Sequence, residues 1–370
     1  MDATEKILFA LLRQRLGEGE QVAVALDAVP ALYALAQKHQ LAHIIADTPQ
    51  LMAVEGLPFR ERLLQTHYRT ERYGHSFGEL CQCFQSEKVP FIPLKGMVLQ
   101  DFYPEKWMRI SSDMDIALHP EDMGRAGALL ESRLGYRPKA MSDHDISYIS
   151  ADGVRVELHH TLIEDDPVLS DFWSHAAPED GSRYRLEEPY FYHYHMAHLA
   201  KHFRHGGCGI RPLLDLWLME RHGMTPPWPA LEQAGLNTFT NACRRLSRCW
   251  FDGQPMEDDL REMEAFILQG GLFGSTVNQQ LLKKTTGGKP RSLSRIFVPV
   301  RELEYTYPIL RRHRWMNPVC QLRRWGNLLL GDKARRRRTE RQCRRSLTAS
   351  QIDATAQLLS RLGLQTPKGR

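Results

Sequence analysis

Two acidic residues two positions apart are the first feature of this sequence that could do chemistry. Asp113 and Asp115 lie in the run Asp-Met-Asp-Ile-Ala-Leu, where apolar residues alternate with acidic ones before the run becomes wholly apolar. This alternation predicts a strand buried mostly on one face, so both carboxylates project to the same side. Two carboxylates this close repel each other unless a cation lies between them, and the pair therefore predicts a metal site.

A third acidic residue follows in a similar pattern. Glu157 lies in Val-Arg-Val-Glu-Leu, residues 154–158, which predicts a neighbouring strand that supplies another oxygen ligand. Three carboxylates on adjacent strands can hold two ions, one that lowers the pKa of an attacking hydroxyl and one that neutralises a leaving pyrophosphate. Oxygen ligands favour Mg²⁺, with Mn²⁺ as the alternative.

A lysine and a glycine upstream complete this pattern. Residues 90–94 predict a short strand, and Lys95-Gly96 opens a predicted helix that continues to Phe102. A glycine at this junction lets a phosphate approach the backbone N–H groups at the helix start, and Lys95 adds a point charge. The turn is a candidate phosphate-binding site.

The order of these motifs resembles that of the DNA polymerase β-like nucleotidyltransferase superfamily. The order is strand, Lys-Gly, helix, Arg109-x-x-x-Asp113-x-Asp115, helix, and then Glu157-x-His159. The closer match is to a bacterial branch described as uncharacterised nucleotidyltransferases. The resemblance is specific over residues 85–165 and looser further on, where it includes His198, Lys201, His202, Gly206, Gly207, Arg211, Asp215, Phe273, Gly274, Tyr307 and Pro308. The superfamily usually has Gly-Ser or Gly-Gly at the phosphate-binding turn, so its serine hydroxyl is missing after Lys95-Gly96.

The resemblance implies an α+β fold, with a polymerase β-like core of a small mixed sheet and helices flanked by helical N- and C-terminal regions. It implies transfer of a nucleoside monophosphate (NMP) from a nucleoside triphosphate (NTP) to a hydroxyl or phosphate acceptor, with release of pyrophosphate. The implied catalytic residues and metal ligands are Asp113, Asp115 and Glu157. The implied nucleotide-binding residues are Lys95, Gly96, Arg109, Ser112 and His159.

Two points stay open within this hypothesis. The base that deprotonates the acceptor is Glu157, with Asp115 as the alternative, and the acceptor is a protein, a peptide, a metabolite or a polysaccharide precursor. A non-catalytic module that binds a nucleotide or a partner is the alternative function. The three intact carboxylates argue against it.

Hydrophobic patterns divide the 370 residues into four parts. We expect a helical N-terminal region over 1–85, an α/β core over 86–165, a helical domain over 166–330 and a basic tail over 331–370. Within the core, a helix from Pro120 ends at Gly135. In the helical domain, helices are predicted over 188–205, 211–222, 228–250 and 257–270, and residues 285–292 predict a linker.

Histidines recur along one predicted helix. His195, His198, His202 and His205 follow steps of three, four and three, which place them on one helical face, while His193 lies close by. His198, His202 and Lys201 are candidates for lining the cleft, where neutral imidazoles could bind a transition metal and protonated ones could contact phosphate. Packed or solvated histidines are the alternative.

Positive charge is concentrated near the C-terminus, although the whole chain carries only +5. The basic residues there are Arg311, Arg312, Arg314, Arg323, Arg324, Lys333, Arg335, Arg336, Arg337, Arg338, Arg341, Arg344 and Arg345. Such a run attracts RNA, an acidic partner or anionic lipid, and the interleaved Trp315 and Trp325 would suit a membrane surface. A solvated helix face is the alternative.

Composition is typical of a cytoplasmic enzyme, with peripheral contact at the inner membrane surface as the alternative. No apolar run approaches the ~18 residues needed to span a bilayer, and residues 1–6 do not resemble a secretory signal. The seven cysteines show no spacing typical of a disulfide framework.

Overall fold

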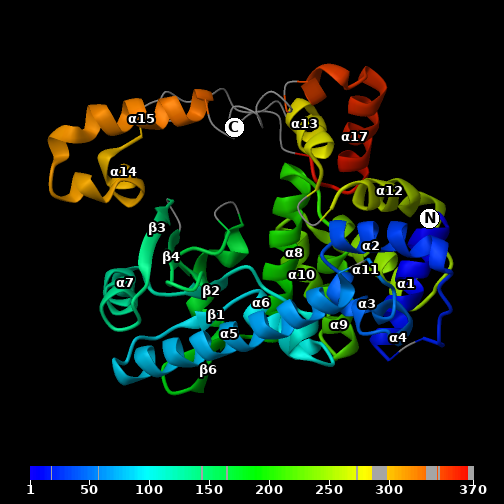
Figure 1. Ribbon diagram of the computed structural model, residues 1–370, viewed down its shortest axis with the longest axis horizontal. Coiled ribbons are helices and arrows are strands. Elements are labelled where there is room, and N and C mark those ends of the chain that lie inside the picture. Colours follow the sequence, from blue (N-terminus) through cyan, green and yellow to red (C-terminus); the bar gives the residue numbers. More distant parts are fainter. Residues whose placement is uncertain are drawn as a thin grey trace.

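The computed structural model describes the chain except residues 18, 57, 143–144, 164–165, 272–273, 286–297, 331–339, 341 and 366–370. Figure 1 shows two parts of the molecule: one contains the sheet and the helices that pack on it, and the other contains a larger group of helices. The architecture is mixed α+β, as the sequence predicts, and the sheet is small and mixed.

Five helices form the N-terminal part. They are α1 (Ala3–Arg15), α2 (Val29–Lys38), α3 (Ala42–Ala46), α4 (Pro49–Met52) and α5 (Phe59–Ser86). An Asp2 capping box starts α1 by satisfying backbone N–H groups at its first turn. The helical character predicted for residues 1–85 agrees with these elements.

The central sheet holds the acidic motifs. Its strands are β1 (Ile92–Pro93), β2 (Met114–Ala117), β3 (Arg137–Met141), β4 (Asp145–Ile149) and β5 (Arg155–His159), in the order β1-β2-β5-β4-β3. Only β2 and β5 pair in parallel within this described sheet, and their register sets Asp115 beside Glu157 and Ala117 beside His159. Asp113 precedes β2. Parallel pairing therefore brings the two acidic motifs to neighbouring positions across 42 residues of sequence.

Two helices cover one face of this sheet. The first is α7 (Met123–Ser132), which follows a 3₁₀ turn at Pro120–Asp122 and is shorter than the predicted helix. The second is α5, whose Tyr73, Phe77, Leu80 and Phe84 recur at helical spacing and pack into the sheet core. The first half of α5 instead packs into the larger helical core, through Phe59 and Leu63. One long helix thus joins both cores.

A second, two-stranded sheet interrupts the region predicted to be helical. Strands β6 (Ala176–Asp180) and β7 (Arg183–Leu186) form a hairpin, and Phe91 pairs with the backbone of Ser182 and Tyr184. The hairpin is mostly half-exposed and carries several charges, so its apolar alternation is too weak to predict strands.

The helices that follow form the larger core. They are α8 (Glu188–His205), α9 (Arg211–Arg221), α10 (Trp228–Gln233), α11 (Asn237–Phe251), α12 (Arg261–Gln269) and α13 (Thr276–Thr285). The predicted helices over 188–205 and 211–222 match α8 and α9 closely. The single helix predicted over 228–250 is divided at Gly235, whose φ of +66° a helix cannot accommodate. Most of α8 is buried, so its cavity-facing residues are held rigidly.

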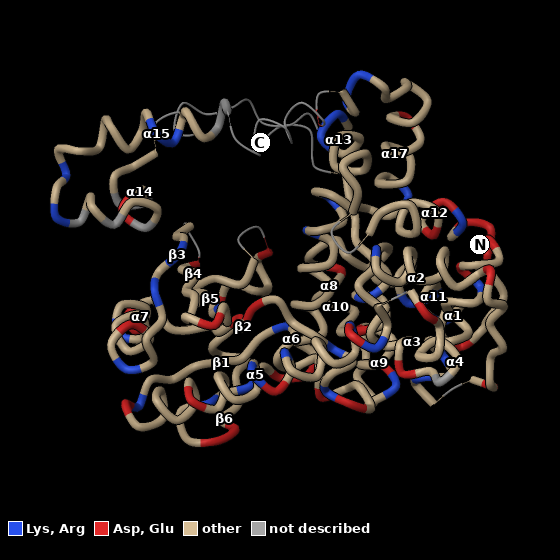
Figure 2. The backbone as a smooth tube through the Cα atoms, in the orientation of Figure 1, with Lys and Arg blue, Asp and Glu red and all other residues tan. Residues whose placement is uncertain are grey.

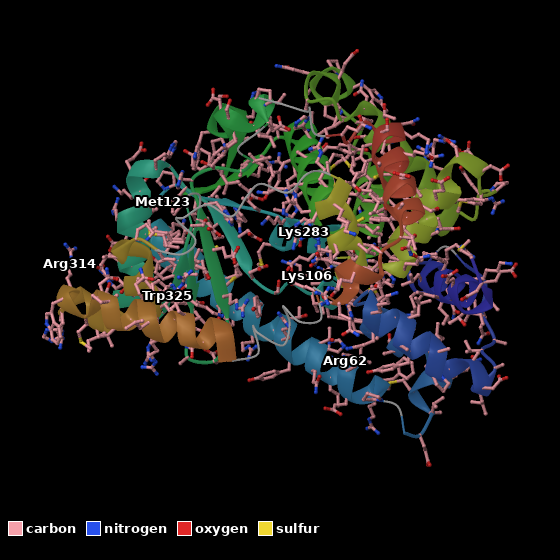
Figure 3. The ribbon with its side chains drawn as sticks, turned by 90° about the horizontal axis from the view of Figure 1, so that it is seen from above. Arg62, Lys106, Met123, Lys283, Arg314 and Trp325 are labelled. Atoms are coloured by element: carbon pink, nitrogen blue, oxygen red, sulfur yellow. The ribbon has the colours of Figure 1, made fainter. Side chains whose placement is uncertain are left out.

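The C-terminal elements include α14 (Val300–Thr306), α15 (Asn317–Leu330) and α17 (Ala349–Arg361). Figures 1 and 3 both show α14 and α15 on the side of the strands and α7. Figure 3 labels Trp325 of α15 and Arg314, which lies just before α15. The predicted linker after Thr285 and the basic run from Lys333 to Arg338 lie outside the described residues, as does Arg341. Among the described helices, none combines the length and the apolar character that a membrane span requires.

A buried histidine fixes the start of α9. The Nδ1 atom of His39 accepts a hydrogen bond from the N–H of Ile210 at 3.4 Å, and its Nε2 faces the carbonyl of Leu268 at the same distance. Accepting at Nδ1 requires a neutral ring. Burial lowers the pKa of His39 to about 4, and burial likewise lowers the pKa of His43, which bonds to the carbonyl of Met108, to about 4.

We therefore expect acid to destabilise the fold before its carboxylates titrate. A histidine whose folded pKa lies below its unfolded value stabilises fully above about 6.5, and this contribution is lost as pH falls toward about 4. His39 and His43 should each remove about 3 kcal/mol from the free energy of unfolding across this range. Urea unfolding at several pH values measures this. His39→Gln should flatten the dependence while exposed His75→Gln should not, and an unchanged slope in His39→Gln would contradict it.

Candidate active site

A cavity of about 310 Å³ lies where the sheet meets α8 and α9. One wall comes from β2, β5 and the turn before α6 (Gly96–Leu99), and the other from the two helices. In Figure 2 the acidic residues of β2 and β5 lie near each other, and a basic segment leads into α6. Seven of the eight residues implied by the resemblance line this cavity: Lys95, Gly96, Arg109, Ser112, Asp113, Asp115 and Glu157. His159 lies directly behind Asp115.

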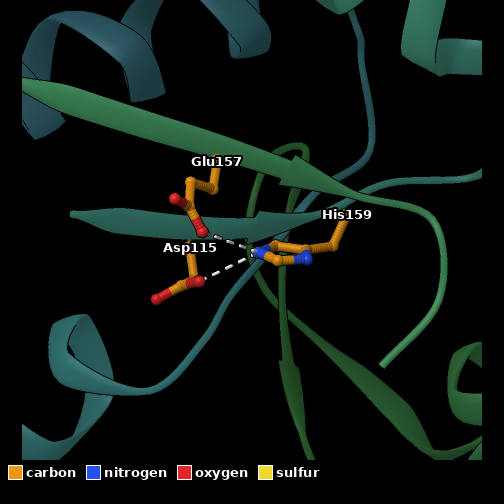
Figure 4. Close-up of side chains that lie close together, drawn as sticks. All are labelled: Asp115, Glu157 and His159. Atoms are coloured by element: carbon orange, nitrogen blue, oxygen red, sulfur yellow. Dashed lines mark hydrogen bonds and ion pairs between the residues drawn. The ribbon is translucent and has the colours of Figure 1, made fainter. Parts of the chain in front are cut away.

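Asp115 is the most buried acid of this wall, with 4 % of its side chain exposed. Its Oδ1 atom accepts a hydrogen bond from Lys95 Nζ at 2.6 Å and lies 2.9 Å from His159 Nε2. Figure 4 shows one ring nitrogen of His159 facing both Asp115 and Glu157; the Oε2 atom of Glu157 is 3.8 Å from this nitrogen. A buried carboxylate requires such partners, so Lys95 and His159 keep Asp115 ionised.

The three acids do not share one electrostatic environment. Burial by itself raises the pKa of Asp115, but the charge of Lys95 and then the hydrogen bond from His159 lower it well below its usual range. Burial, followed by the charge of Asp115, raises the pKa of Asp113. Burial, followed by the charges of Asp115 and Asp113, also raises the pKa of Glu157. Asp113 and Glu157 are therefore the acids whose repulsion is not compensated.

This wall suits a divalent cation. Among the described residues, the donor atoms of Asp115, Glu157 and His159 lie within 4.8 Å of one another. Opposite ligands of an octahedral Mg²⁺ ion lie about 4 Å apart, so a small adjustment would allow joint ligation. Asp113 lies outside this group but lines the same cavity. The ammonium of Lys95 already occupies a position against Asp115 where positive charge is stabilised.

The Lys95-Gly96 turn has a strained backbone. Lys95 adopts φ +47° and ψ −119°, a conformation that favours glycine and costs about 1–3 kcal/mol for another residue. Its side chain forms the ion pair with Asp115, which explains a lysine at this strained position. Gly96 is required for packing, because a Cβ there would lie 1.8 Å from the hydroxyl of Ser111. A serine hydroxyl thus lies at the start of α6, but Ser111 supplies it from a different loop.

Helix α5 holds the loop that precedes β2. The hydroxyl of Tyr73 donates to the carbonyl of Ser112 at 2.8 Å, and the hydroxyl of Ser112 donates to Asp113 Oδ1 at 3.1 Å. The packing of α5 on the sheet therefore also sets the position of Asp113. Ser112 contacts an acid here, whereas the resemblance assigns it to the nucleotide.

Arg109 is committed to a buried ion pair. Its Nε and second guanidinium nitrogen donate to the two carboxylate oxygens of Asp215 on α9, at 2.7 and 3.0 Å. The hydroxyl of Tyr103 donates to the same carboxylate at 2.8 Å. Arg109 is only 8 % exposed, so this bidentate pair ties the loop before β2 to α9. The predicted contact of Arg109 with triphosphate must therefore use guanidinium N–H groups that do not donate to Asp215.

The histidine face of α8 divides into two groups. His195, His198 and His202 line the cavity, and the Nε2 atoms of His198 and His202 lie 3.2 Å apart. Burial, followed by the charge of Lys95, lowers the pKa of His202 to about 4 and that of His198 well below its usual value. Both rings are therefore neutral near pH 7, which argues against the protonated phosphate contact. Lys201 and His205 are exposed outside the cavity.

His193 lies outside the cavity, whereas two charged residues of α9 line it. His193 pairs with buried Asp166 at 2.8 Å, away from the cavity lining. Arg211 and Asp215 both line the cavity, although in the sequence they belong only to the looser part of the resemblance. The signal for them was an arginine and an aspartate four positions apart in an otherwise apolar helix start, where a charge must find a partner. No sequence pattern indicated that Tyr103 would contact Asp215 or that Tyr194 would line the cavity.

Comparison with known proteins agrees with this geometry. A family model described as uncharacterised nucleotidyltransferase matches residues 27–252, which include every element that lines the cavity. The chain belongs to this family and is a transferase of phosphorus-containing groups. No curated protein and no solved structure matched the chain.

The ion pair between Arg109 and Asp215 gives a prediction about stability. Asp215→Asn would leave the buried guanidinium of Arg109 without its carboxylate partner, beside the partly buried Arg211. Breaking one side of a buried pair costs about 3–5 kcal/mol, so the free energy of unfolding should fall by this amount in chemical denaturation. Asp101→Asn, which removes an exposed pair with Lys106, is the matched control and should change little. Equal effects of the two substitutions would contradict the prediction.

Proposed function

We propose that this protein is a Mg²⁺-dependent nucleotidyltransferase with a polymerase β-like core. It transfers NMP from an NTP to a hydroxyl or phosphate acceptor and releases pyrophosphate. The observation that carries this proposal is the pairing of Asp115 with Glu157 on parallel strands, with Lys95 and the Gly96 turn facing the same cavity. The acidic group next to a basic turn suits a substrate that combines a metal ion with phosphates.

In this proposal Asp113, Asp115 and Glu157 hold the ion, and Lys95 and the Gly96 turn receive the triphosphate. A divalent ion bound there would neutralise phosphate charge and lower the pKa of the acceptor hydroxyl. His159 orients Asp115 through their 2.9 Å contact, and its ring nitrogen lies close enough to Asp115 and Glu157 to join them as a ligand of the ion; neither role is direct contact with nucleotide. Arg109 positions the loop that carries Asp113.

Glu157 is the better placed base of the two candidates. Its side chain is 24 % exposed, whereas Asp115 is 4 % exposed and already contacts Lys95 and His159. The acceptor oxygen would attack the α-phosphorus as the bond to pyrophosphate breaks, and the hydroxyl proton would pass to Glu157. The acceptor in this proposal is a protein, a peptide, a metabolite or a polysaccharide precursor.

Binding of an NTP should depend on the metal. The cavity lining carries four carboxylates, Asp113, Asp115, Glu157 and Asp215, against three permanent cations, Lys95, Arg109 and Arg211. A triphosphate therefore meets a net negative lining unless a divalent ion is present. Isothermal titration with each of the four common NTPs should show at least tenfold tighter binding in Mg²⁺ than in chelator. Equal affinity under the two conditions would refute the proposed site.

Substitution of the two aspartates should separate catalysis from stability. Asp113→Asn and Asp115→Asn should each lower NMP transfer by orders of magnitude. Asp113→Asn removes an uncompensated charge, so its melting temperature in chelator should hold or rise. Asp115→Asn removes the partner of Lys95, so its melting temperature should fall.

The outcome also tests the non-catalytic alternative. A module that only binds nucleotide would show tight NTP binding with no transfer in the wild-type protein. Two variants with equal melting temperatures would show that Lys95 does not stabilise Asp115 in the manner described.

A further inference from the structure

Arg211 is a partly buried cation whose hydrogen-bond partners, among the described residues, are all neutral. It is the first residue of α9 and lines the cavity. One terminal nitrogen of its guanidinium donates to the carbonyl of Ile110 at 3.2 Å and to Gln40 Oε1 at 3.3 Å. Its Nε atom is buried and has no hydrogen-bond partner, and across the described part of the chain no carboxylate lies within ion-pair distance. A partly buried charge with an unpaired, buried Nε donor and only neutral partners is costly, so this arrangement calls for an anion.

The carboxylate on the same helix already belongs to another arginine. Asp215 lies one helical turn after Arg211, but both of its oxygens accept hydrogen bonds from Arg109. Burial, followed by the charge of Arg109, lowers the pKa of Arg211 to about 10, so it remains charged at neutral pH. Two arginines and one aspartate leave one positive charge in excess on the helical wall of the cavity.

We propose that Arg211 forms an anion subsite that binds a phosphate group of the substrate. The inference rests on the proposed function for the identity of the substrate. A guanidinium fork matches two phosphate oxygens, and the positive end of the α9 dipole lies at the same residue. The phosphate is either part of the NTP or a group on the acceptor, and both present the same chemistry.

The subsite lies opposite the acidic wall. Arg211 comes from α9, whereas Asp115 and Glu157 come from the sheet. A substrate bound by Arg211 and by these two acids would therefore span the seam, by which we mean the boundary between the sheet core and the larger helical core. Arg109 holds this seam together through Asp215, and Arg211 donates to the carbonyl of Ile110 in the same loop. The two arginines therefore have different roles in this proposal: Arg109, which is paired with Asp215, positions the loop, and Arg211 binds the ligand.

Isothermal titration of matched variants tests the proposal. The probes are pyrophosphate with Mg²⁺, an NTP with Mg²⁺, and inorganic phosphate. Arg211→Gln should weaken pyrophosphate binding at least tenfold, and Arg211→Lys should weaken it less because the charge remains without the fork. Arg155→Gln is the control, since Arg155 is an exposed arginine of β5 near Asp113 but outside the cavity. Its affinities should stay within about twofold of the wild type.

The probes also identify the source of the phosphate. Parallel losses for pyrophosphate and NTP in Arg211→Gln assign the subsite to the triphosphate. Loss of inorganic phosphate binding with unchanged NTP affinity assigns it to a phosphate on the acceptor. Unchanged affinity for all three probes overturns the subsite, as does a wild-type protein that binds none of them. A wild-type protein that binds pyrophosphate but transfers no NMP leaves the subsite standing and refutes the proposed function.

Two further measurements keep the result independent of folding. The melting temperature of ligand-free Arg211→Gln should hold or rise, because the substitution relieves repulsion with Arg109, whereas a purely structural arginine would lower it. In the wild-type protein, pyrophosphate should protect Arg211 from the arginine reagent phenylglyoxal, as measured by peptide mass spectrometry. Labelling of Arg211 that pyrophosphate does not reduce would overturn the proposal even if the variant fails to fold.

Discussion

Charged side chains buried where the sheet meets α8 and α9 must be compensated, and the rest of the site depends on this constraint. Removing a charge from water costs several kcal/mol unless a partner lies close to it. Lys95 compensates Asp115 within the sheet part, and Asp215 compensates Arg109 across the seam. These two pairs set the positions of the Lys95-Gly96 turn and of the loop that carries Asp113.

After these two ion pairs are formed, the unpaired charges of opposite sign lie on different walls of the cavity. Asp113 and Glu157 are in excess on the sheet wall, and Arg211 is in excess on the helical wall. A substrate that brings both a divalent cation and phosphates would satisfy both walls at once. Neutral His198 and His202 line the cavity between these charges without adding to either. The proposed reaction and the proposed subsite are therefore two consequences of one distribution of charge.

Local strain and rigid support coincide at this site. Lys95 holds a backbone conformation that favours glycine, and it lies between β1, which pairs with β2, and the short helix α6. Helix α5 supports the opposite end of the loop before β2 through Tyr73, and His39 holds the start of α9. Strained conformations persist where the surrounding packing determines them, and here that packing comes from both hydrophobic cores.

The sequence by itself determined the family, the mixed α+β class and the pairing of acidic strands, because alternation and motif order are local properties of the chain. It also predicted α8 and α9 closely, since both carry strong helical patterns. It did not reveal the β6–β7 hairpin, whose polar strands lack clear alternation, or the interruption at Gly235.

Only the tertiary structure decided which charges are paired. Arg109 and Asp215 are 106 residues apart, and nothing local indicates that they meet. The same packing sets His159 against Asp115, places Ser111 beside Gly96 and leaves Arg211 with no carboxylate partner among the described residues. Residue types and spacing can therefore predict which residues gather at this cavity, whereas their pairing depends on contacts between distant segments.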